Sequence, residues 1–255
     1  MTGARKDKIA SAFGAVAEGY EEHAGVQRIA ARTVADLAAL RALPQNARIL
    51  EIGCGTGLLT REIGQRWPTA SLVATDLAAG MVEHAADGAM LAGTFLPMDG
   101  ERPWFDGPHF DLILSSLAFQ WFDDLELALA RLQGLLRPEG RLIFSTMGAD
   151  SFANWRAAHA ACDVVAGVPD YPDLKSLSQA LGAYPDAFAF EETYPVEWGS
   201  AQGLIRHLKG IGASVPAPGH RPVPAGALRR VMSRFDEAGA RDNYHVLFGR
   251  ITRLA

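Results

Sequence analysis

The fold is decided by the stretch Leu50-Glu51-Ile52-Gly53-Cys54-Gly55-Thr56-Gly57. A β-prone run over residues 48–52 stops here at alternating glycines, and a helical pattern follows over 58–66. Glycine lets the backbone turn sharply and lets a ligand lie against bare peptide groups. Doubly wound sheets bind ligands at the carboxyl ends of their strands. A glycine-rich loop between a strand and a helix therefore predicts a site for a nucleotide cofactor.

Strands and helices alternate on both sides of this loop. We expect strands over residues 48–52, 71–76, 93–98, 109–115, 141–146, 188–198 and 244–251. We expect helices over residues 9–20, 26–43, 58–66, 81–86, 125–136, 152–165, 201–211 and 225–238. A tight turn is expected at 138–140, and a Pro- and Gly-rich loop at 215–226.

The alternation predicts an α/β fold. We expect a doubly wound, mostly parallel, Rossmann-like sheet of seven strands, with N-terminal helices and a small helical insertion before the last strand. One domain should span residues 1–255. Within it we expect a helical cap on the substrate side at 1–45, a cofactor-binding core at 46–150, and a substrate- and partner-side elaboration at 151–255.

Composition excludes several classes of protein. The chain has 255 residues, 49% apolar and 21% charged, which is ordinary for a globular protein. It has no apolar run near the roughly 18 residues that cross a bilayer, and its basic N-terminus lacks the apolar region of a signal peptide. Its cysteines, Cys54 and Cys162, form no disulfide framework and no metal-ligand spacing. We therefore expect a cytoplasmic protein with no membrane association and no metal.

The spacing of the glycines separates two cofactor classes. A dinucleotide fingerprint requires Gly-x-Gly-x-x-Gly/Ala, and Leu58 stands at its last position. The chain also has no Gly-Lys-Ser/Thr, which excludes the phosphate loop of NTPases. Glu-x-Gly-x-Gly-x-Gly is instead typical of class I S-adenosylmethionine methyltransferases, which the loop resembles.

The resemblance implies roles for three acids at successive strand ends. Glu51 would orient the cationic methionine end, Asp76 would accept the ribose hydroxyls, and Asp99 would bind the adenine amino group. The full expected set of cofactor-binding residues is Glu51, Gly53, Cys54, Gly55, Gly57, Asp76, Leu77, Met81, Asp99, Gly100 and Ser115. The expected cofactor is S-adenosyl-L-methionine.

Further motifs narrow the family. They lie at residues 9–13 with 20–24, 110–121, 136–146, 208–213 and 244–249. With these motifs the chain resembles the BioC family, the malonyl-[acyl-carrier protein] O-methyltransferases of biotin synthesis. The resemblance covers most of the chain and is weakest over 163–200. It implies methyl transfer to the free carboxylate of a malonyl thioester on acyl carrier protein.

A carboxylate acceptor needs no general base, because its unperturbed pKa of about 4 leaves it ionised near neutrality. Positioning and exclusion of water then remain, and orientation alone supplies roughly 7–11 kcal/mol in favourable cases. A strong ion pair would stabilise the attacking charge in the ground state, so we expect neutral donors as catalytic residues: Tyr20, Gln120 and Trp121. Tyr20 and Trp121 are also suited to plain core packing. His245 is either a further candidate or an ordinary sheet histidine.

Charge is unevenly distributed along the chain. The net charge is −5, yet residues 202–255 contain nine Lys or Arg against three acids. Acyl carrier proteins are strongly acidic, so a basic surface near the pocket would steer docking. The expected partner-binding residues are Arg206, Lys209, Arg229, Arg230 and Arg234; a merely solvated basic face is the alternative.

Other functions share the cofactor loop. A methyltransferase for a small free polycarboxylic acid would need no protein partner, and a non-catalytic assembly factor on the same fold would need no intact loop. A nucleic-acid substrate is disfavoured by the pI of 5.8 and by the lack of an Asn-Pro-Pro-Tyr motif. We expect a monomer.

Overall fold

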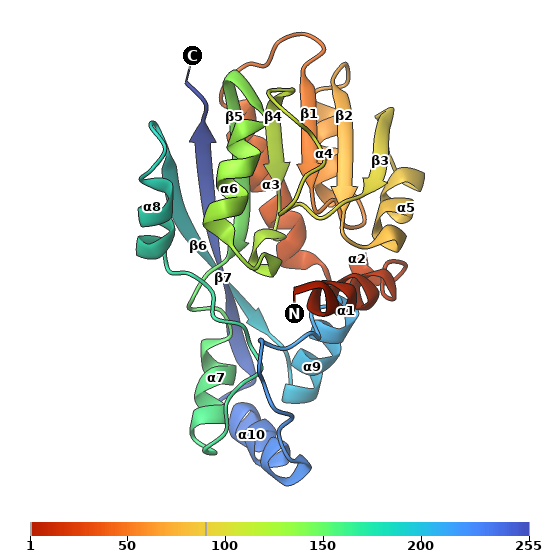
Figure 1. Cartoon of the computed structure of the whole chain (residues 1–255). Coiled ribbons are helices and arrows are strands. Elements are labelled where there is room, and N and C mark those ends of the chain that lie inside the picture. Colours follow the sequence, from red (N-terminus) through yellow and green to blue (C-terminus); the bar gives the residue numbers. More distant parts are fainter. Residues whose placement is uncertain (1, 90, 255) are drawn as a thin grey trace.

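The computed structural model describes residues 2–89 and 91–254, and within them one mixed sheet organises the fold (Figure 1). The order of its seven strands is β3-β2-β1-β4-β5-β7-β6. The strands are β1 (Arg48–Ile52), β2 (Ser71–Asp76), β3 (Gly93–Pro97), β4 (Phe110–Ser115), β5 (Leu136–Met147), β6 (Phe188–Glu197) and β7 (Arg241–Thr252).

The pairing of the strands confirms the expected doubly wound sheet and adds one detail. The pairs from β3 to β5 are parallel, whereas β7 pairs antiparallel with both β5 and β6. β7 therefore runs against the other six strands, so the sheet is mixed. The strand order reverses direction between β1 and β4, which is where such sheets bind ligands.

Helices cover both faces of the sheet (Figure 1). They are α1 (Thr2–Gly14), α2 (Tyr20–His23), α3 (Gly25–Ala39), α4 (Leu58–Arg66), α5 (Ala79–Asp87), the 3₁₀ turn η1 (Phe119–Trp121), α6 (Leu125–Gly134), α7 (Ala153–Ala160), α8 (Leu174–Leu181), α9 (Ala201–Gly210) and α10 (Ala225–Glu237). No helix among the described residues has the length and apolarity to cross a membrane.

Successive residues of β1 point into two different hydrophobic cores. Ile49 belongs to a core built with α3 and α4, whereas Leu50 belongs to a core built with α6 and α8. A parallel strand covered on both faces is apolar almost throughout, which explains the run before the glycines. Burial on both sides holds the carboxyl end of β1 in place.

The first helix differs from its expected range. The pattern over residues 9–20 predicts one continuous helix, but α1 ends at Gly14 and α2 begins at Tyr20. Gly14 packs closely against Gly80 of α5, because a Cβ at Gly80 would lie 3.4 Å from the Gly14 carbonyl oxygen. The glycines at 14 and 19 favour a turn over a helix, and this turn reorients Tyr20.

Differences elsewhere concern ends of elements and one missed helix. α3 ends at Ala39 instead of 43, and β5 already begins at Leu136, so the expected turn at 138–140 is an irregularity within a strand. α7 ends at Ala160 instead of 165, followed by a turn in which Asp163 has a φ of 55°. Helix α8 was not expected; its signal is the N-cap Asp173, whose side chain accepts from the Ser176 N–H.

Candidate active site

The glycine loop is held by contacts on two sides. The N–H groups of Gly53 and Cys54 both donate to the carbonyl oxygen of Thr75 at the end of β2, at 2.8 and 2.9 Å. Gly53 has a φ of +73°, and a Cβ there would lie 2.4 Å from the Cβ of Ala118. Only glycine adopts this positive φ without strain and also leaves room for Ala118. The loop therefore lies directly against the segment that follows β4.

Gly55 and Asp76 form the polar centre of the loop. The Gly55 N–H donates to one oxygen of Asp76 at 2.9 Å, and the Ala78 N–H donates to the other at 2.8 Å. Burial raises the pKa of Asp76 above its ordinary value, and the amide bonds oppose that rise. Space is open within 4 Å of a Cβ built on Gly55, whose φ is +54°. A ligand can therefore approach the backbone here.

A cavity of about 100 Å³ lies at the carboxyl ends of β1, β2 and β3. We call it the strand-end cavity. Part of its lining consists of expected cofactor residues, namely Gly53, Gly55, Asp76, Leu77, Met81, Asp99 and Gly100. Helix α1 contributes Lys6, Ile9 and Phe13 to the same lining. The sequence thus predicts the strand side of this cavity, and α1 supplies a cover over it.

The structure places four expected cofactor residues outside this lining. Ser115 is buried, and its hydroxyl donates to the carbonyl oxygen of Ile52 at 2.8 Å, so its neighbour Ser116 lines the cavity instead. Cys54 is buried beneath the loop, and Gly57 precedes α4 with a φ of +90°. These three residues support the conformation of the loop and do not line the cavity.

Glu51, the fourth of these residues, is fully buried. One oxygen accepts from the Thr60 hydroxyl at 2.7 Å, and the other has no hydrogen-bond partner among the described residues. Burial raises the pKa of Glu51 to about 8. An unpaired buried acceptor is costly, and a cationic group beside the loop would satisfy it. The role expected for Glu51 toward the methionine end stays a prediction.

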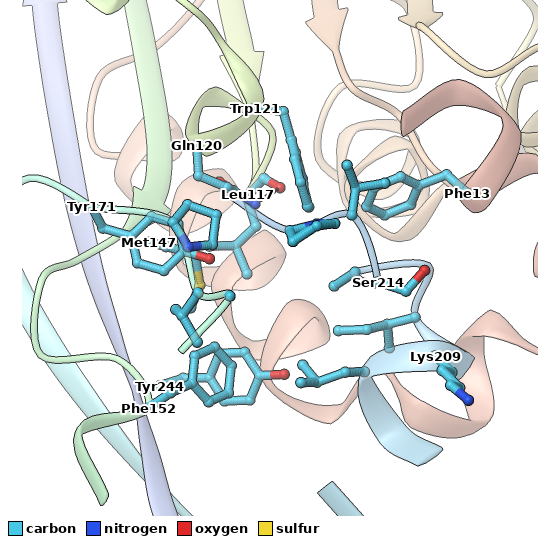
Figure 2. A pocket seen from close by; sticks show the side chains of 18 of the residues that line it. Phe13, Leu117, Gln120, Trp121, Met147, Phe152, Tyr171, Lys209, Ser214 and Tyr244 are labelled. Atoms are coloured by element: carbon cyan, nitrogen blue, oxygen red, sulfur yellow. Dashed lines mark hydrogen bonds between the residues drawn. The ribbon is translucent and has the colours of Figure 1, made fainter. Parts of the chain in front are cut away.

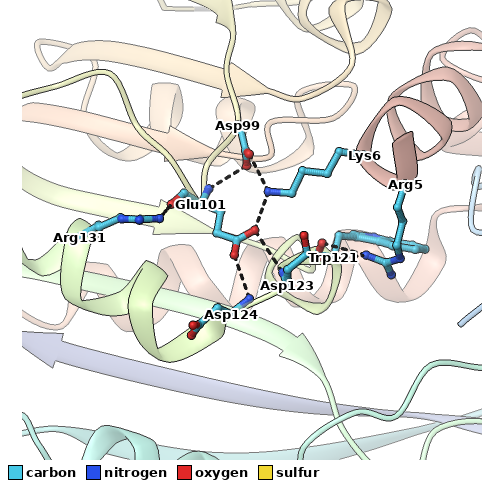
Figure 3. A network of polar contacts seen from close by, with 8 residues as sticks. All are labelled: Arg5, Lys6, Asp99, Glu101, Trp121, Asp123, Asp124 and Arg131. Carbon is cyan, nitrogen blue, oxygen red and sulfur yellow. Dashed lines mark hydrogen bonds and ion pairs between the residues drawn. The ribbon is translucent and has the colours of Figure 1, made fainter. Parts of the chain in front are cut away.

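An ion-pair network joins α1 to the strand ends (Figure 3). The Nζ of Lys6 lies 2.6 Å from an oxygen of Asp99 and 2.5 Å from an oxygen of Glu101. The carboxylate of Glu101 is buried and also accepts the backbone N–H groups of Asp123 and Asp124. Burial raises the pKa of Glu101, but Lys6 and these amides outweigh it and lower the pKa below its ordinary value. Asp99 thus has a partner that the sequence did not predict.

A second, larger cavity of about 290 Å³ adjoins the first (Figure 2). We call it the apolar cavity, because most of its lining is hydrophobic: Met147, Phe152, Trp155, Ile205, Leu208 and Pro216 are examples. Among the described residues that line it, Lys209 is the one Lys or Arg. Its size and lining are typical of small-molecule sites.

The two cavities share a wall made of Phe13, Tyr20, Leu117 and Trp121. The rings of Phe13 and Trp121 meet edge to face, with centroids 5.4 Å apart. A group bound in the strand-end cavity therefore faces a group bound in the apolar cavity across a few side chains. This junction is the place for a transfer reaction.

The expected catalytic residues lie at or beside this wall. Tyr20 and Trp121 line both cavities, and Gln120 lines the apolar cavity only. Burial, then the charges of Asp76 and Glu21, raise the pKa of Tyr20, so its phenol stays protonated. The Nε2 of Gln120 donates to the Leu117 carbonyl, and its Oε1 has no partner among the described residues. One of the donors expected from Gln120 is thus used within its own loop.

His245 lies outside the linings of both cavities. Its Nε2 lies 3.0 Å from an oxygen of Glu191, and its Nδ1 accepts the Asp150 N–H at 3.2 Å. A Cβ at Gly148 would lie 2.4 Å from its ring. His245 therefore joins β7 to β6 and to the segment after β5, in a structural role.

Among the expected partner-binding residues, Lys209 reaches the apolar cavity, and the other four are exposed outside its lining. Arg206 lies with Lys209 on α9. Arg229, Arg230 and Arg234 lie on α10, at the end of the molecule beyond the carboxyl ends of the parallel strands (Figure 1).

Sequence reasoning missed several lining residues. Phe13 and Leu117 complete the shared wall, Lys6 and Ser116 line the strand-end cavity, and Gln27 lines the apolar cavity. Phe13 belongs to the apolar pattern of the first helix, which gave a signal for packing only. Lys6 and Gln27 lie far from the glycine loop in sequence, and nothing local indicates their place.

Comparison with known proteins shows the family of the chain. The family described as "Methyltransferase domain" matches residues 20–184. The chain is 42% identical to the biotin biosynthesis bifunctional protein BioCD of Bordetella avium, over 95% of this chain and 51% of that protein. It is 39% identical to the malonyl-[acyl-carrier protein] O-methyltransferase of Magnetococcus marinus, over 98% of this chain and 94% of that protein. The chain thus spans about half of the first relative and nearly all of the second.

Solved structures share the fold at low sequence identity. Phosphoethanolamine N-methyltransferase 2 of Haemonchus contortus, solved with phosphomonomethylethanolamine and S-adenosylhomocysteine, superposes with a TM-score of 0.60 at 15% identity. The match covers 95% of this chain and 58% of that one. The likeness extends to the overall fold.

Replacing Glu51 by Gln should change how stability depends on pH. The pKa of about 8 in the folded protein lies above the ordinary 4.5, so the folded protein keeps a proton that the unfolded chain has lost. The free energy of unfolding should therefore fall as pH rises between these values, by at most about 1.4 kcal/mol per pH unit. Urea unfolding of the ligand-free protein across this window should show a shallower fall for Glu51→Gln. The exposed Glu18→Gln is the control, and parallel slopes for wild type and Glu51→Gln would contradict the interpretation.

Proposed function

Because the chain belongs to the family of malonyl-[acyl-carrier protein] O-methyltransferases, we propose that it methylates the free carboxylate of a malonyl thioester on acyl carrier protein. The methyl donor is S-adenosyl-L-methionine, and the product is the malonyl methyl ester that starts pimelate synthesis for biotin. The observation that carries the proposal is the wall shared by the two cavities. It brings a cofactor site and an acceptor site within reach of each other.

The strand-end cavity fits the cofactor. Gly55 leaves the backbone open to a ligand, and Asp76 presents a carboxylate fixed by two amides for the ribose hydroxyls. Glu51 lies outside the cavity lining and has an unpaired buried oxygen, so it would act on the cationic methionine end through a water molecule or backbone amides. When bound, S-adenosylmethionine supplies a methyl group already activated by its sulfonium.

The residues of the wall orient the acceptor. A protonated Tyr20 phenol and the Trp121 indole N–H are neutral donors for a carboxylate at the junction, and Gln120 retains one N–H for it. The apolar lining excludes water, and among the described residues that line the apolar cavity Lys209 is the one Lys or Arg. Neutral donors hold the nucleophile without the ground-state stabilisation that an ion pair would bring.

The carrier protein would dock on the basic surface of α9 and α10. Lys209 lines the apolar cavity, so this surface begins at the cavity itself. The phosphopantetheine arm would then pass Lys209 and carry the malonyl group inward. Both cysteines are free, in keeping with a reducing cytoplasm. A monomeric state and the lack of a nucleic-acid substrate stay predictions.

Incubation with labelled S-adenosylmethionine should identify the acceptor. Malonyl carrier protein should become a methyl ester far faster than malonyl-CoA, and free malonate should remain unmodified. The reason is that docking raises the local concentration of the thioester and the apolar cavity favours its acyl arm. Release of labelled methanol by base measures the ester. Methylation of a small free acid with no reaction of the carrier protein would overturn the proposal.

The change Tyr20→Phe removes one donor to a charged oxygen. Such a bond contributes about 1.5–3 kcal/mol, so kcat/KM for malonyl carrier protein should fall roughly 10- to 150-fold. The dissociation constant for S-adenosylmethionine should change much less, as measured by calorimetry. Tyr194→Phe on β6, outside both cavities, should behave as wild type. Equal effects of the two changes would exclude Tyr20 from acceptor binding.

Reversing charge at Arg229 and Arg230 should weaken docking. We expect the double change to Glu to raise KM for the carrier protein about tenfold at low salt and to flatten its salt dependence. Reversal of Arg41 and Arg48, which lie near the amino end of β1, is the matched control. Steady-state kinetics over a salt series measure both. Identical salt dependence in wild type and the α10 double variant would place docking elsewhere.

A further inference from the structure

Gln27 is a buried polar residue that the reaction described so far does not use. It lies in the first turn of α3, lines the apolar cavity, and is 8% exposed. Its side-chain oxygen Oε1 is buried and has no hydrogen-bond partner among the described residues. Few buried acceptors are left unpaired in native proteins, so this one requires an explanation.

The side chain of Tyr244 lies near Gln27 and bonds to another residue. The hydroxyl of Tyr244 lies 2.8 Å from Nε2 of His207, so these two side chains share a hydrogen bond. Burial, then the nearby His23, lower the pKa of His207 to about 4, so this imidazole is neutral near pH 7. Burial raises the pKa of Tyr244, and the nearby Gln27 side chain partly offsets that rise. Gln27 Oε1 has no hydrogen bond to either residue and stays without a partner among the described residues.

Figure 2 shows where Tyr244 lies in the apolar cavity. Gln120 and Trp121 lie at the top of the view, and Tyr244 lies at the bottom with its hydroxyl directed into the cavity. Gln27 lines the same cavity and follows closely in sequence after Tyr20, a residue of the shared wall. A thioester arm that delivers its carboxylate to the wall therefore has Gln27 in the lining around it.

The chemistry of Gln27 selects the group that it binds. The oxygen of a neutral amide accepts an N–H or O–H, and neither Tyr244 nor the neutral His207 carries a charge. A pantetheine arm carries such a donor, because its first amide N–H follows the thioester by two methylene groups. The malonyl carboxylate and this amide lie at opposite ends of one short chain, and the wall and Gln27 are parts of one cavity lining.

We propose that Gln27 Oε1 accepts the first amide N–H of the substrate's pantetheine arm, so that Gln27 is a specificity residue that sets how deeply the malonyl group enters. This inference rests on the proposed function. The cavity thus recognises a thioester arm by its amide and the acyl group by its carboxylate.

The test compares two arms that differ in one atom. Carrier protein is loaded with malonyl-pantetheine, or with an analogue in which the first amide N–H is replaced by an ester oxygen. The loss of a hydrogen bond to a buried acceptor should lower kcat/KM at least about tenfold for the ester arm. An ester oxygen also places two acceptors face to face. If the wild-type protein methylates both arms at equal rates, the inference is wrong, and no variant is needed to show this.

Variants assign the preference to Gln27. Gln27→Met keeps the size and removes the acceptor, so its preference for the amide arm should shrink to less than about threefold. Gln27→Glu keeps an acceptor oxygen and should keep the preference. Gln120→Met, in the 3₁₀ turn η1, should slow both arms alike and leave their ratio unchanged. Thermal unfolding checks that each variant is folded; if the Gln27 variants do not fold, the comparison of the two arms with the wild type decides alone.

Two failures can be told apart. The role of Gln27 is wrong if the wild type methylates both arms equally well, or if Gln27→Met retains the full preference for the amide arm. Either result leaves the proposed function intact. A wild type that methylates neither arm, while it methylates some other acid, removes the proposed function and this inference with it.

Discussion

The contact between Gly53 and Ala118 is the constraint on which the rest of the site depends. Gly53 has a left-handed backbone conformation that leaves no room for a side chain beside Ala118. The loop after β1 and the segment after β4 therefore meet at the point where the sheet changes direction. On one side of this contact the glycine loop opens toward Asp76, and on the other side η1 presents Trp121. A larger residue at position 53 would separate the two halves of the site.

Much of the architecture could be predicted from the sequence, because its signals are local. Every strand was expected, although β5 begins at Leu136 instead of 141. Apolar runs that end at turn residues reflect burial on both faces in the central strands, whereas β3 and β6 contain no buried residue. The class of cofactor followed from Leu58 and the acids at successive strand ends. Helix α8 was missed even though its cap and apolar spacing are ordinary, because the surrounding segment offers little pattern.

The remaining features depend on contacts between distant segments. Lys6 binds Asp99 and Glu101 across more than ninety residues of chain, and no spacing within the sequence encodes such a pair. Tyr20 was expected on a continuous helix, yet it reaches the wall because the chain turns after Gly14. The role proposed for Tyr20 does not depend on the continuous helix that was expected there. Likewise, whether every polar atom of a buried side chain such as Gln27 or Glu51 has a hydrogen-bond partner depends on how the whole chain packs.

The way that α1 closes the strand-end cavity has a practical consequence for handling the protein. Lys6 is half-buried and pairs with two carboxylates within a few residues of the start of α1 at Thr2. β7 ends at Thr252, near the amino end of its antiparallel neighbour β5 and away from both cavities (Figure 1). A purification tag or fusion partner attached before α1 would lie next to the helix that covers the strand-end cavity and could disturb its packing. A tag attached after β7 would lie away from that helix, so this end is preferable for tags, surface immobilisation and fluorescent reporters.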